Sequence, residues 1–189
     1  MRAFVPFARR ISVALFLTLA PLAAAGAQTP DEQAAVAADI APGRFVWKAE
    51  AASEGPVRVL VSIPLQMAFV YRGDALVGVS SVSTGQPGYD TPTGTFNILE
   101  KDKDHKSNIY DDAPMPYMLR LTWDGVALHA GHVTGQPASH GCVRLPAAFA
   151  KKLFDITPKG ATVTVVDEVP EFMQTGELQG PASTETASR

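Results

Sequence analysis

The chain has 189 residues, of which 46% are hydrophobic and 19% are charged, as in an ordinary globular protein. Its formal net charge is −3, and most of the acidic excess lies near the two ends of the chain. The middle is close to neutral. Because a nucleic-acid-binding surface requires a clustered basic face, we expect no nucleic-acid partner.

The first 27 residues have the three parts of a secretory signal peptide. Arginines precede an apolar run at 11–22, and small residues lead to Ala27, after which we expect cleavage. The run is shorter than the roughly 20 residues of a membrane-spanning helix, so we expect no membrane span after processing. We therefore expect export to the periplasm. The pair Arg9-Arg10 leaves both the general and the twin-arginine export routes open.

The processed chain divides into three parts by composition. Residues 28–44 are rich in alanine and acidic side chains and are expected to form a spacer. Residues 45–167 are expected to fold as one domain. Residues 168–189 contain few apolar side chains, and we expect this acidic tail to be disordered.

Within the domain, β-strand patterns dominate. Residues 57–63 alternate apolar and other side chains with a period of two, which predicts a half-buried strand. Further strands are predicted at 66–71, 75–82, 95–99, 117–122, 126–129 and 161–166, with a hairpin turn at 72–74. Pro146 is suited to the first position of a helix, and Phe149, Leu153 and Phe154 follow at helical spacing. These elements predict a mainly β sandwich or barrel with a short helix after the cysteine.

Chemistry-bearing residues are concentrated between residues 128 and 146. Three of the four histidines and the only cysteine lie there. A lone cysteine in an exported protein is exposed to oxidation, so we infer that its thiol is used. We assign Cys142 as a nucleophile and His129, at the end of a predicted strand, as its proton acceptor and donor. The expected helix after Cys142 would lower its thiol pKa.

Neighbouring residues are expected to support this pair. The backbone amides of Gly141 and Cys142, with His140 nearby, are candidates for an oxyanion hole. Ser139 is expected to orient one of the histidines through a hydrogen bond. The fourth histidine, His105, lies in a charged run that is most simply a solvated turn.

Three residues are candidates for binding substrate. Arg144 suits a carboxylate, because a guanidinium donates two parallel hydrogen bonds, but it would equally well brace the loop. His132 would contact substrate or remain a solvated loop residue. Tyr117, with Met115 and Pro116 before it, would line a groove or belong to the core.

Two other classes of function fit the same side chains. His129, His132, His140 and Cys142 are possible zinc ligands, but the cluster holds no acidic residue to act as the base of a metal enzyme. A noncatalytic binding module that retains the fold would lack the cysteine or the base, and both are present. We expect no metal and no cofactor.

The motif Ser139-His140-Gly141-Cys142-Val143-Arg144, with His129 upstream, resembles the signature of the YkuD-type L,D-transpeptidases. The segments 83–85 and 91–96 extend the resemblance to about residues 57–166. It implies a β-rich catalytic domain acting on peptidoglycan stem peptides, in which the cysteine attacks the third residue and D-alanine leaves. It also implies sensitivity to carbapenems. The acyl acceptor remains open: a second stem in a 3→3 cross-link, water, or an amine of an outer-membrane protein.

Overall fold

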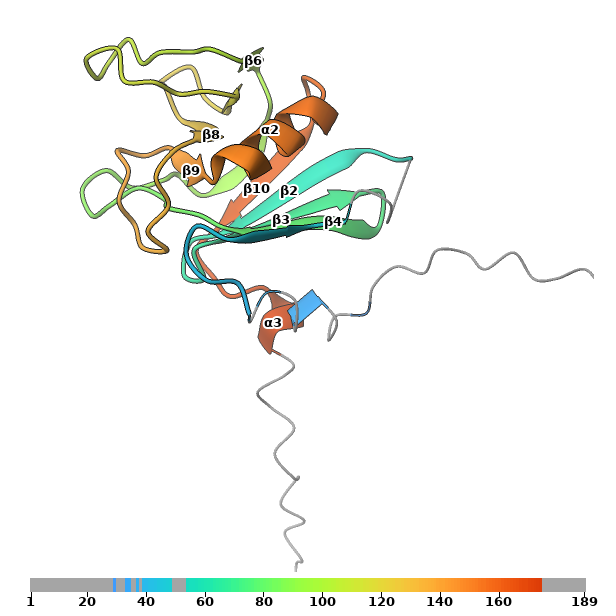
Figure 1. Ribbon diagram of the computed structural model, residues 1–189. Helices are drawn as coiled ribbons and strands as arrows, with labels where there is room; N and C mark the ends of the chain where they lie inside the picture. The colour runs from blue at the N-terminus through green and yellow to red at the C-terminus, as the bar shows by residue number, and fades with distance from the viewer. Residues whose placement is uncertain (1–28, 30–32, 35–36, 38, 49–53, 175–189) are drawn as a thin grey trace, which may run out of the picture.

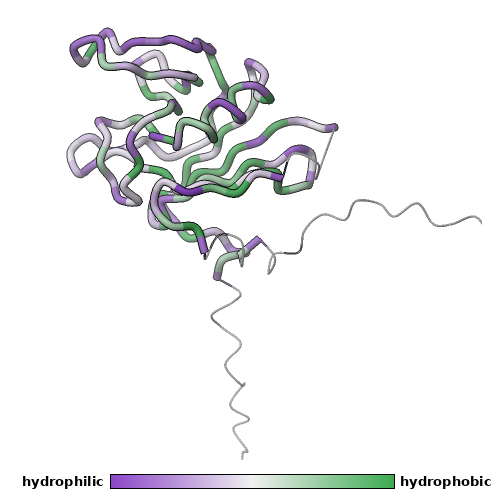
Figure 2. Tube along the Cα trace, viewed as in Figure 1, coloured by the Kyte–Doolittle hydropathy of each residue, from purple (hydrophilic) through white to green (hydrophobic). Residues whose placement is uncertain are grey.

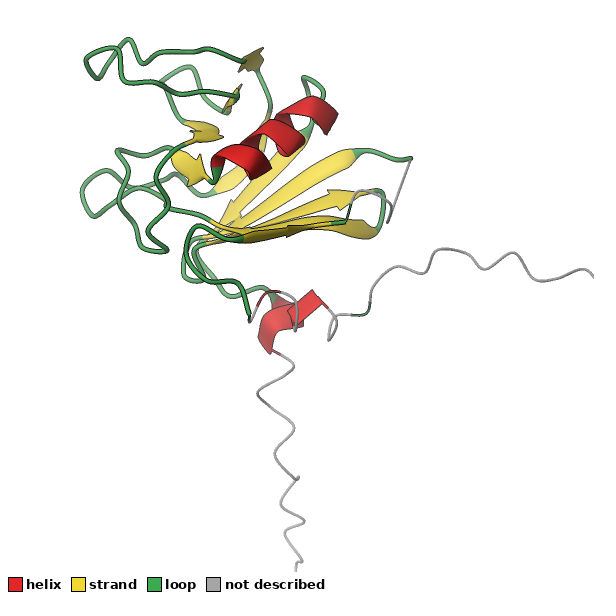
Figure 3. Ribbon diagram, viewed as in Figure 1, coloured by secondary structure: helices red, strands yellow, loops and turns green. Residues whose placement is uncertain are grey.

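The computed structural model describes residues 29, 33–34, 37, 39–48 and 54–174, so the predicted signal peptide lies outside the described residues. These described residues form two sheets and a ten-residue helix (Figures 1 and 3). The larger sheet has the order β1-β4-β3-β2-β10-β5, and the smaller has the order β6-β7-β8-β9. The strands of the larger sheet are β1 (Phe45–Trp47), β2 (Val57–Ser62), β3 (Met67–Arg72), β4 (Ala75–Ser81), β5 (Gly94–Asn97) and β10 (Thr162–Val166). Those of the smaller are β6 (Glu100–Asp102), β7 (Met118–Arg120), β8 (Ala127–Ala130) and β9 (Val143–Leu145).

The expected β-rich fold class is confirmed. In β2, Val57, Val59 and Val61 are buried, as the alternating pattern predicts. β3 and β4 form the predicted hairpin, in which Gly73 has a φ of +57°. The parallel pairing of β10 with β2 places the end of the domain inside the larger sheet, between β2 and the edge strand β5.

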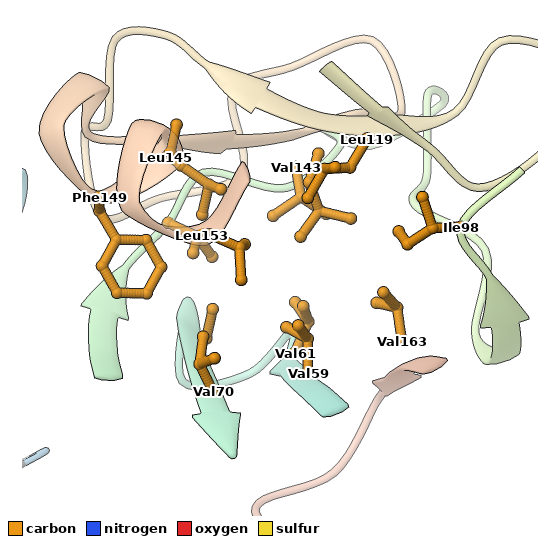
Figure 4. Packing of buried hydrophobic residues seen from close by; sticks show 14 of the residues in the cluster. Val59, Val61, Val70, Ile98, Leu119, Val143, Leu145, Phe149, Leu153 and Val163 are labelled. Atoms are coloured by element: carbon orange, nitrogen blue, oxygen red, sulfur yellow. The ribbon is translucent and has the colours of Figure 1, made fainter. Parts of the chain in front are cut away.

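Helix α2 (Ala147–Ile156) buries its apolar face between the sheets. Phe149 and Leu153 are fully buried, and Figure 4 shows them opposite valines of the larger sheet. Pro146 is the N-cap of α2 rather than its first helical residue. The rings of Phe45 and Trp47 pack edge-on against Phe149, with centroids 5.5 and 5.3 Å away. These contacts join β1, the larger sheet and α2 in one core.

The other face of the larger sheet is covered by segments near the two ends of the described chain. Ala37 and Met173 pack against a cluster that includes Phe69. Met173 belongs to α3 (Glu171–Gln174), which lies on the side of the sheet away from α2 (Figure 1). Residues 171–174 are therefore helical, where the sequence predicted disorder. Part of the predicted spacer packs on the sheet too.

The described residues contain no helix long and apolar enough to cross a membrane. Apolar residues follow the strands, whereas the loop after β6 is strongly hydrophilic (Figure 2). The smaller sheet positions the functional residues. Its parallel pair β8 and β9 aligns His129 with Arg144 and Leu128 with Val143, so the predicted base and the segment after the cysteine lie side by side.

Candidate active site

A cavity of about 530 Å³ lies beside the smaller sheet. Its walls come from the end of β8, the loop that precedes β9, the start of α2 and the hairpin at 103–117. It is lined by Ser107, Tyr110, Ala113, Pro114, Met115, Pro116, His129, Ala130, Gly131, His132, Ser139, His140, Cys142, Arg144 and Ala147. The cavity thus brings together the proposed nucleophile, the proposed base and most of their predicted neighbours.

His129 is held as a neutral base. Its side chain is only 7% exposed, and its Nδ1 lies 2.8 Å from the carbonyl oxygen of Ala130. Because a carbonyl oxygen only accepts hydrogen bonds, Nδ1 carries the proton and Nε2 keeps its lone pair. Burial lowers the pKa of His129 below its ordinary value, against the opposing effect of the Ala130 hydrogen bond. The ring is therefore uncharged at neutral pH, with Nε2 able to accept a proton.

Cys142 is a protonated thiol in a largely apolar setting. It packs against Met115, Met118 and Ala127, and its Sγ donates to the carbonyl oxygen of Gly125 at 3.4 Å. Burial raises the pKa of the Cys142 thiol, although the Ala127 backbone N–H and then the Arg144 charge act in the opposite direction. The sequence predicted a lowered pKa.

Burial is the main physical reason for this difference, and the element that follows the cysteine is the second. The sequence predicted that Cys142 lies close to a helix N-terminus, where the helix dipole favours a thiolate. In the structure β9 (Val143–Leu145) intervenes, and α2 begins only at Ala147. The dipole acts within the first turn of a helix, so a strand of three residues removes Cys142 from its range.

Ser139 orients the backbone of the nucleophile rather than a histidine. Its Oγ donates to the carbonyl oxygen of Cys142 at 2.5 Å and accepts the N–H of Gly141 at 3.2 Å. The Gly141 amide, which the sequence suggested as an oxyanion donor, is therefore already bonded. Among the described residues, the Cys142 N–H has no hydrogen-bond acceptor in the protein.

His140 lies between two tyrosines that the sequence did not single out. Its ring centroid is 4.4 Å from that of Tyr89 and 4.9 Å from that of Tyr110. Tyr89 and Tyr110 are 46% and 42% exposed, and Tyr110 lines the cavity together with His140. This arrangement holds His140 by ring packing. No local sequence pattern joins these rings, because Tyr110 is about 30 residues from His140 in the chain.

Arg144 presents an unpaired charge to the cavity. Its backbone bonds to Ser83 in both directions, and its aliphatic stem packs over Gly131. A Cβ on Gly131 would lie 3.1 Å from Arg144 Cγ, so the glycine admits this stem. Within the described part of the chain, the guanidinium forms no ion pair. His132 also lines the cavity and is exposed.

Tyr117 is not brought to the cavity. Its ring packs edge-on against Phe154 of α2, with centroids 5.8 Å apart, while Met115 and Pro116 line the cavity in its place. The backbone explains the difference. Tyr117 has a φ of +57°, an uncommon value for a tyrosine, which interrupts the strand pattern just before β7.

His105 is not a residue of a simple solvated turn. Its Nδ1 lies 3.2 Å from Asp102 Oδ2, and its Nε2 lies 3.4 Å from an amino group of Arg120. Arg120 also donates through Nε to Glu100 Oε2 at 2.7 Å. This charged cluster lies at the base of the hairpin that forms one wall of the cavity.

The zinc hypothesis lacks a suitable set of ligands. In the described ranges, no three side chains from His, Cys, Asp and Glu are grouped closely enough to hold a metal ion. The predicted ligands share the cavity without converging on one point. The arrangement instead suits nucleophilic chemistry, since a neutral imidazole and a thiol line one cavity with an unpaired cation.

Comparisons with known proteins give one consistent family. The profile of the YkuD L,D-transpeptidase catalytic domain matches residues 56–166. An L,D-transpeptidase from Mycobacterium tuberculosis H37Rv has a TM-score of 0.57 at 23% identity over 59% of this chain and 58% of its own. An L,D-transpeptidase from Stackebrandtia nassauensis has a TM-score of 0.55 at 30% identity, with coverages of 63% and 58%. The L,D-transpeptidase LdtMt1, solved with imipenem, has a TM-score of 0.54 at 26% identity, with 59% of each chain covered.

This chain spans less than two thirds of each of these solved chains. No curated protein sequence matches it.

Proposed function

The chain belongs to the YkuD family of L,D-transpeptidase catalytic domains, and from this premise we propose that it is a cysteine acyltransferase acting on peptidoglycan stem peptides. The observation that carries the proposal is one cavity lined by Cys142, by His129 with its Nε2 lone pair free, and by the unpaired Arg144. A thiol, a neutral base and a carboxylate-binding cation are the groups that an acyl transfer from an anionic peptide requires.

In the first half-reaction, Cys142 attacks the carbonyl carbon of the third residue of a stem tetrapeptide. His129 Nε2 takes the thiol proton as the sulfur–carbon bond forms. The tetrahedral intermediate then collapses, the carbon–nitrogen bond to D-alanine breaks, and His129 returns its proton to the departing amine. A thioester on Cys142 remains.

In the second half-reaction, an amine attacks the thioester carbonyl. His129 removes a proton from the attacking amine and gives it to the sulfur as the thiol leaves. With a second stem peptide as acceptor, the product is a 3→3 cross-link. In each half-reaction His129 acts first as a base and then as an acid. This sequence requires a ring that is neutral when each half-reaction begins.

Arg144 is our candidate for the residue that binds a carboxylate of the stem peptide. Its guanidinium is half-buried and forms no ion pair with the acidic side chains that the structure describes, so its charge is available for a ligand. The planar fork of the guanidinium matches a carboxylate. His132, exposed on the same wall, is a second candidate contact. These contacts would retain the anionic donor on the β9 side of the thiol.

Two alternatives share the first half-reaction and differ in what resolves the thioester. Water as acceptor would make the protein an L,D-carboxypeptidase. An amine of an outer-membrane protein as acceptor would attach that protein to peptidoglycan. For either, we propose that the protein acts in the periplasm, reached through cleavage of the signal peptide at 1–27, with 45–167 as the catalytic domain.

The test is mass spectrometry of purified chain 28–189 incubated with tetrapeptide muropeptides. We expect loss of D-alanine, a 3→3 dimer and a transient acyl adduct on Cys142. Tripeptide without dimer would identify the carboxypeptidase. Cys142→Ala should bind the muropeptide without turnover, and turnover by this variant would refute the mechanism. Absence of both products and adduct in folded protein would refute the substrate.

A further inference from the structure

Thr91 connects the nucleophile loop to a part of the chain about 50 residues away. It is 4% exposed and does not line the cavity. Its Oγ1 donates to the carbonyl oxygen of Gly141 at 2.9 Å and accepts the backbone N–H of Gly85 at 2.8 Å. The hydroxyl thus uses both of its hydrogen-bonding functions on backbone groups. A threonine that served only as a turn residue would not require either of these two hydrogen bonds.

The bond to Gly141 also fixes the next amide. The carbonyl of Gly141 and the N–H of Cys142 belong to one planar trans peptide unit, in which they point in opposite directions. Thr91 is buried and does not line the cavity, so its bond draws the Gly141 carbonyl toward the protein interior. The Cys142 N–H lies on the opposite edge of the same peptide unit and therefore points away from Thr91.

This peptide unit needs an external constraint. Gly141 has a φ of +104°, in the region that favours glycine, and glycine is the residue whose backbone is most free to rotate. Ser139 fixes the units on either side by bonding the Gly141 N–H and the Cys142 carbonyl oxygen. Thr91 holds the unit between them. The three bonds leave only the Cys142 N–H without an acceptor in the described part of the protein.

We propose that Thr91 is a positioning residue for acylation: by holding the Gly141–Cys142 peptide, it aims the Cys142 N–H at the oxygen that becomes negative when the thiol attacks a carbonyl. This inference rests on the proposed function in taking Cys142 as an acyl-accepting nucleophile. A donor already aligned with the developing oxyanion stabilises the transition state without reorganisation. Thr91 touches no reacting atom itself.

Two reactions of the Cys142 sulfur distinguish positioning of the Cys142 N–H by Thr91 from a general effect of Thr91 on the structure. Acylation by imipenem passes through an oxyanion, whereas alkylation by iodoacetamide requires only the thiolate. Both second-order rate constants would be measured by intact-protein mass spectrometry on wild type, Thr91→Val and Thr91→Ser. Valine keeps the shape of threonine and removes the hydroxyl, while serine retains it. Thr157→Val serves as a control, because it removes another buried hydroxyl, bonded to Leu153, outside the cavity.

We expect Thr91→Val to slow acylation by about 10- to 100-fold, less than the 10²–10³ that follows complete loss of an oxyanion donor. Alkylation should stay within about twofold, because the thiol keeps its surroundings. Thr91→Ser and Thr157→Val should acylate within about threefold of wild type. Equal acylation by Thr91→Val and wild type would refute the proposal, as would equal slowing of both reactions.

If Thr91→Val does not fold, Thr91→Ala, which also removes the hydroxyl, tests the proposal by the ratio of acylation to alkylation. An unchanged ratio in folded Thr91→Ala would refute it. The outcome for the proposed function is separate. If wild type opens imipenem but leaves tetrapeptide stems unchanged, the proposed substrate fails while the role of Thr91 stands.

Discussion

Burial shifts the two titratable groups of the site in opposite directions, so that both are uncharged near neutral pH. The pKa of Cys142 is raised from the ordinary 9.0 by burial, and the pKa of His129 is lowered from 6.5, also by burial. A thiolate–imidazolium ion pair would require both shifts to be reversed. The free protein therefore holds a neutral pair, and in the proposed mechanism the proton moves only when substrate is in place.

This neutral pair predicts the pH dependence of thiol alkylation. Iodoacetamide reacts with the thiolate, so its rate constant with wild type should rise with pH to a midpoint above 9.0. His129→Gln should show nearly the same midpoint, because the ring that it replaces is already neutral there. Rapid alkylation that persists to about pH 5 would instead reveal an ion pair.

The same two pKa shifts set the pH range over which turnover is expected. The base is lost only when pH falls below the lowered pKa of His129, and the neutral thiol is lost only above the raised pKa of Cys142. We expect kcat/KM to be flat between these limits, with its acid limb centred below pH 6.5. Measurement of kcat/KM from pH 4.5 to 10 checks this, and an acid limb centred above 6.5 would contradict it.

At the scale of elements, the C-terminal end of helix α2 is bonded by a residue of the smaller sheet. Lys101, in β6, donates through Nζ to the carbonyl oxygens of Phe154 at 2.7 Å and Thr157 at 2.5 Å. The last turn of α2 contains no basic residue of its own. A cation at a helix C-terminus satisfies free carbonyls and complements the dipole. Lys101 therefore joins the sheet that carries the site to the helix between the sheets.

We predict that Lys101→Met lowers the free energy of unfolding by about 1.5–3 kcal/mol, the range for hydrogen bonds to a charged group. Lys103→Met is the matched control, because Lys103 is exposed on the same segment and its side chain forms no ion pair among the described residues. Urea unfolding followed by circular dichroism measures both. Equal stability of the two variants would show that the bonds to α2 contribute nothing.

The hairpin at 103–117 contains contacts that the sequence did not predict. Its two legs pair through the Met115 N–H and the His105 carbonyl oxygen, while the charged cluster of Asp102, His105 and Arg120 lies at its base. The charges and turn formers were visible in the sequence. Their partners were not, because Arg120 meets His105 only when β7 pairs with β6.

At the scale of the molecule, local sequence patterns predicted most of the strands. The pairing between strands, which determines their order in the two sheets, was not predicted. Alternation predicted the buried face of β2, and helical spacing predicted that Phe149 and Leu153 face the core. Neither pattern contains the order of strands in two sheets or the parallel pairing of β8 with β9. That pairing places a strand after Cys142, so no helix dipole opposes the burial that raises the pKa of its thiol. Likewise, the partners of Ser139 are backbone groups, which side-chain chemistry alone does not reveal.

The cover on the outer face of the larger sheet was the least predictable feature. The segments near both ends of the described chain have weak apolar patterns, and each contributes only a few side chains to a shared cluster. Ala37 comes from one end and Met173 from the other, and they meet over Phe69, which is fully buried. Composition predicts disorder when a segment cannot bury enough apolar surface alone, but here the sheet supplies the missing surface.

This cover predicts that α3 is part of the stable fold. Met173→Asp places a carboxylate against the apolar cluster, so α3 should detach and uncover Phe69 and its neighbours. A fully buried methionine contributes up to about 3 kcal/mol, and Met173 is only partly buried. We therefore expect the free energy of unfolding to fall by less than this amount, and binding of the dye ANS to increase. Met173→Leu keeps the apolar contact and should behave as wild type in both measurements. If the two variants match in stability and dye binding, the domain ends before α3, as composition alone suggested. The cavity lies at the smaller sheet, so imipenem acylation by folded Met173→Asp should stay within about twofold of wild type.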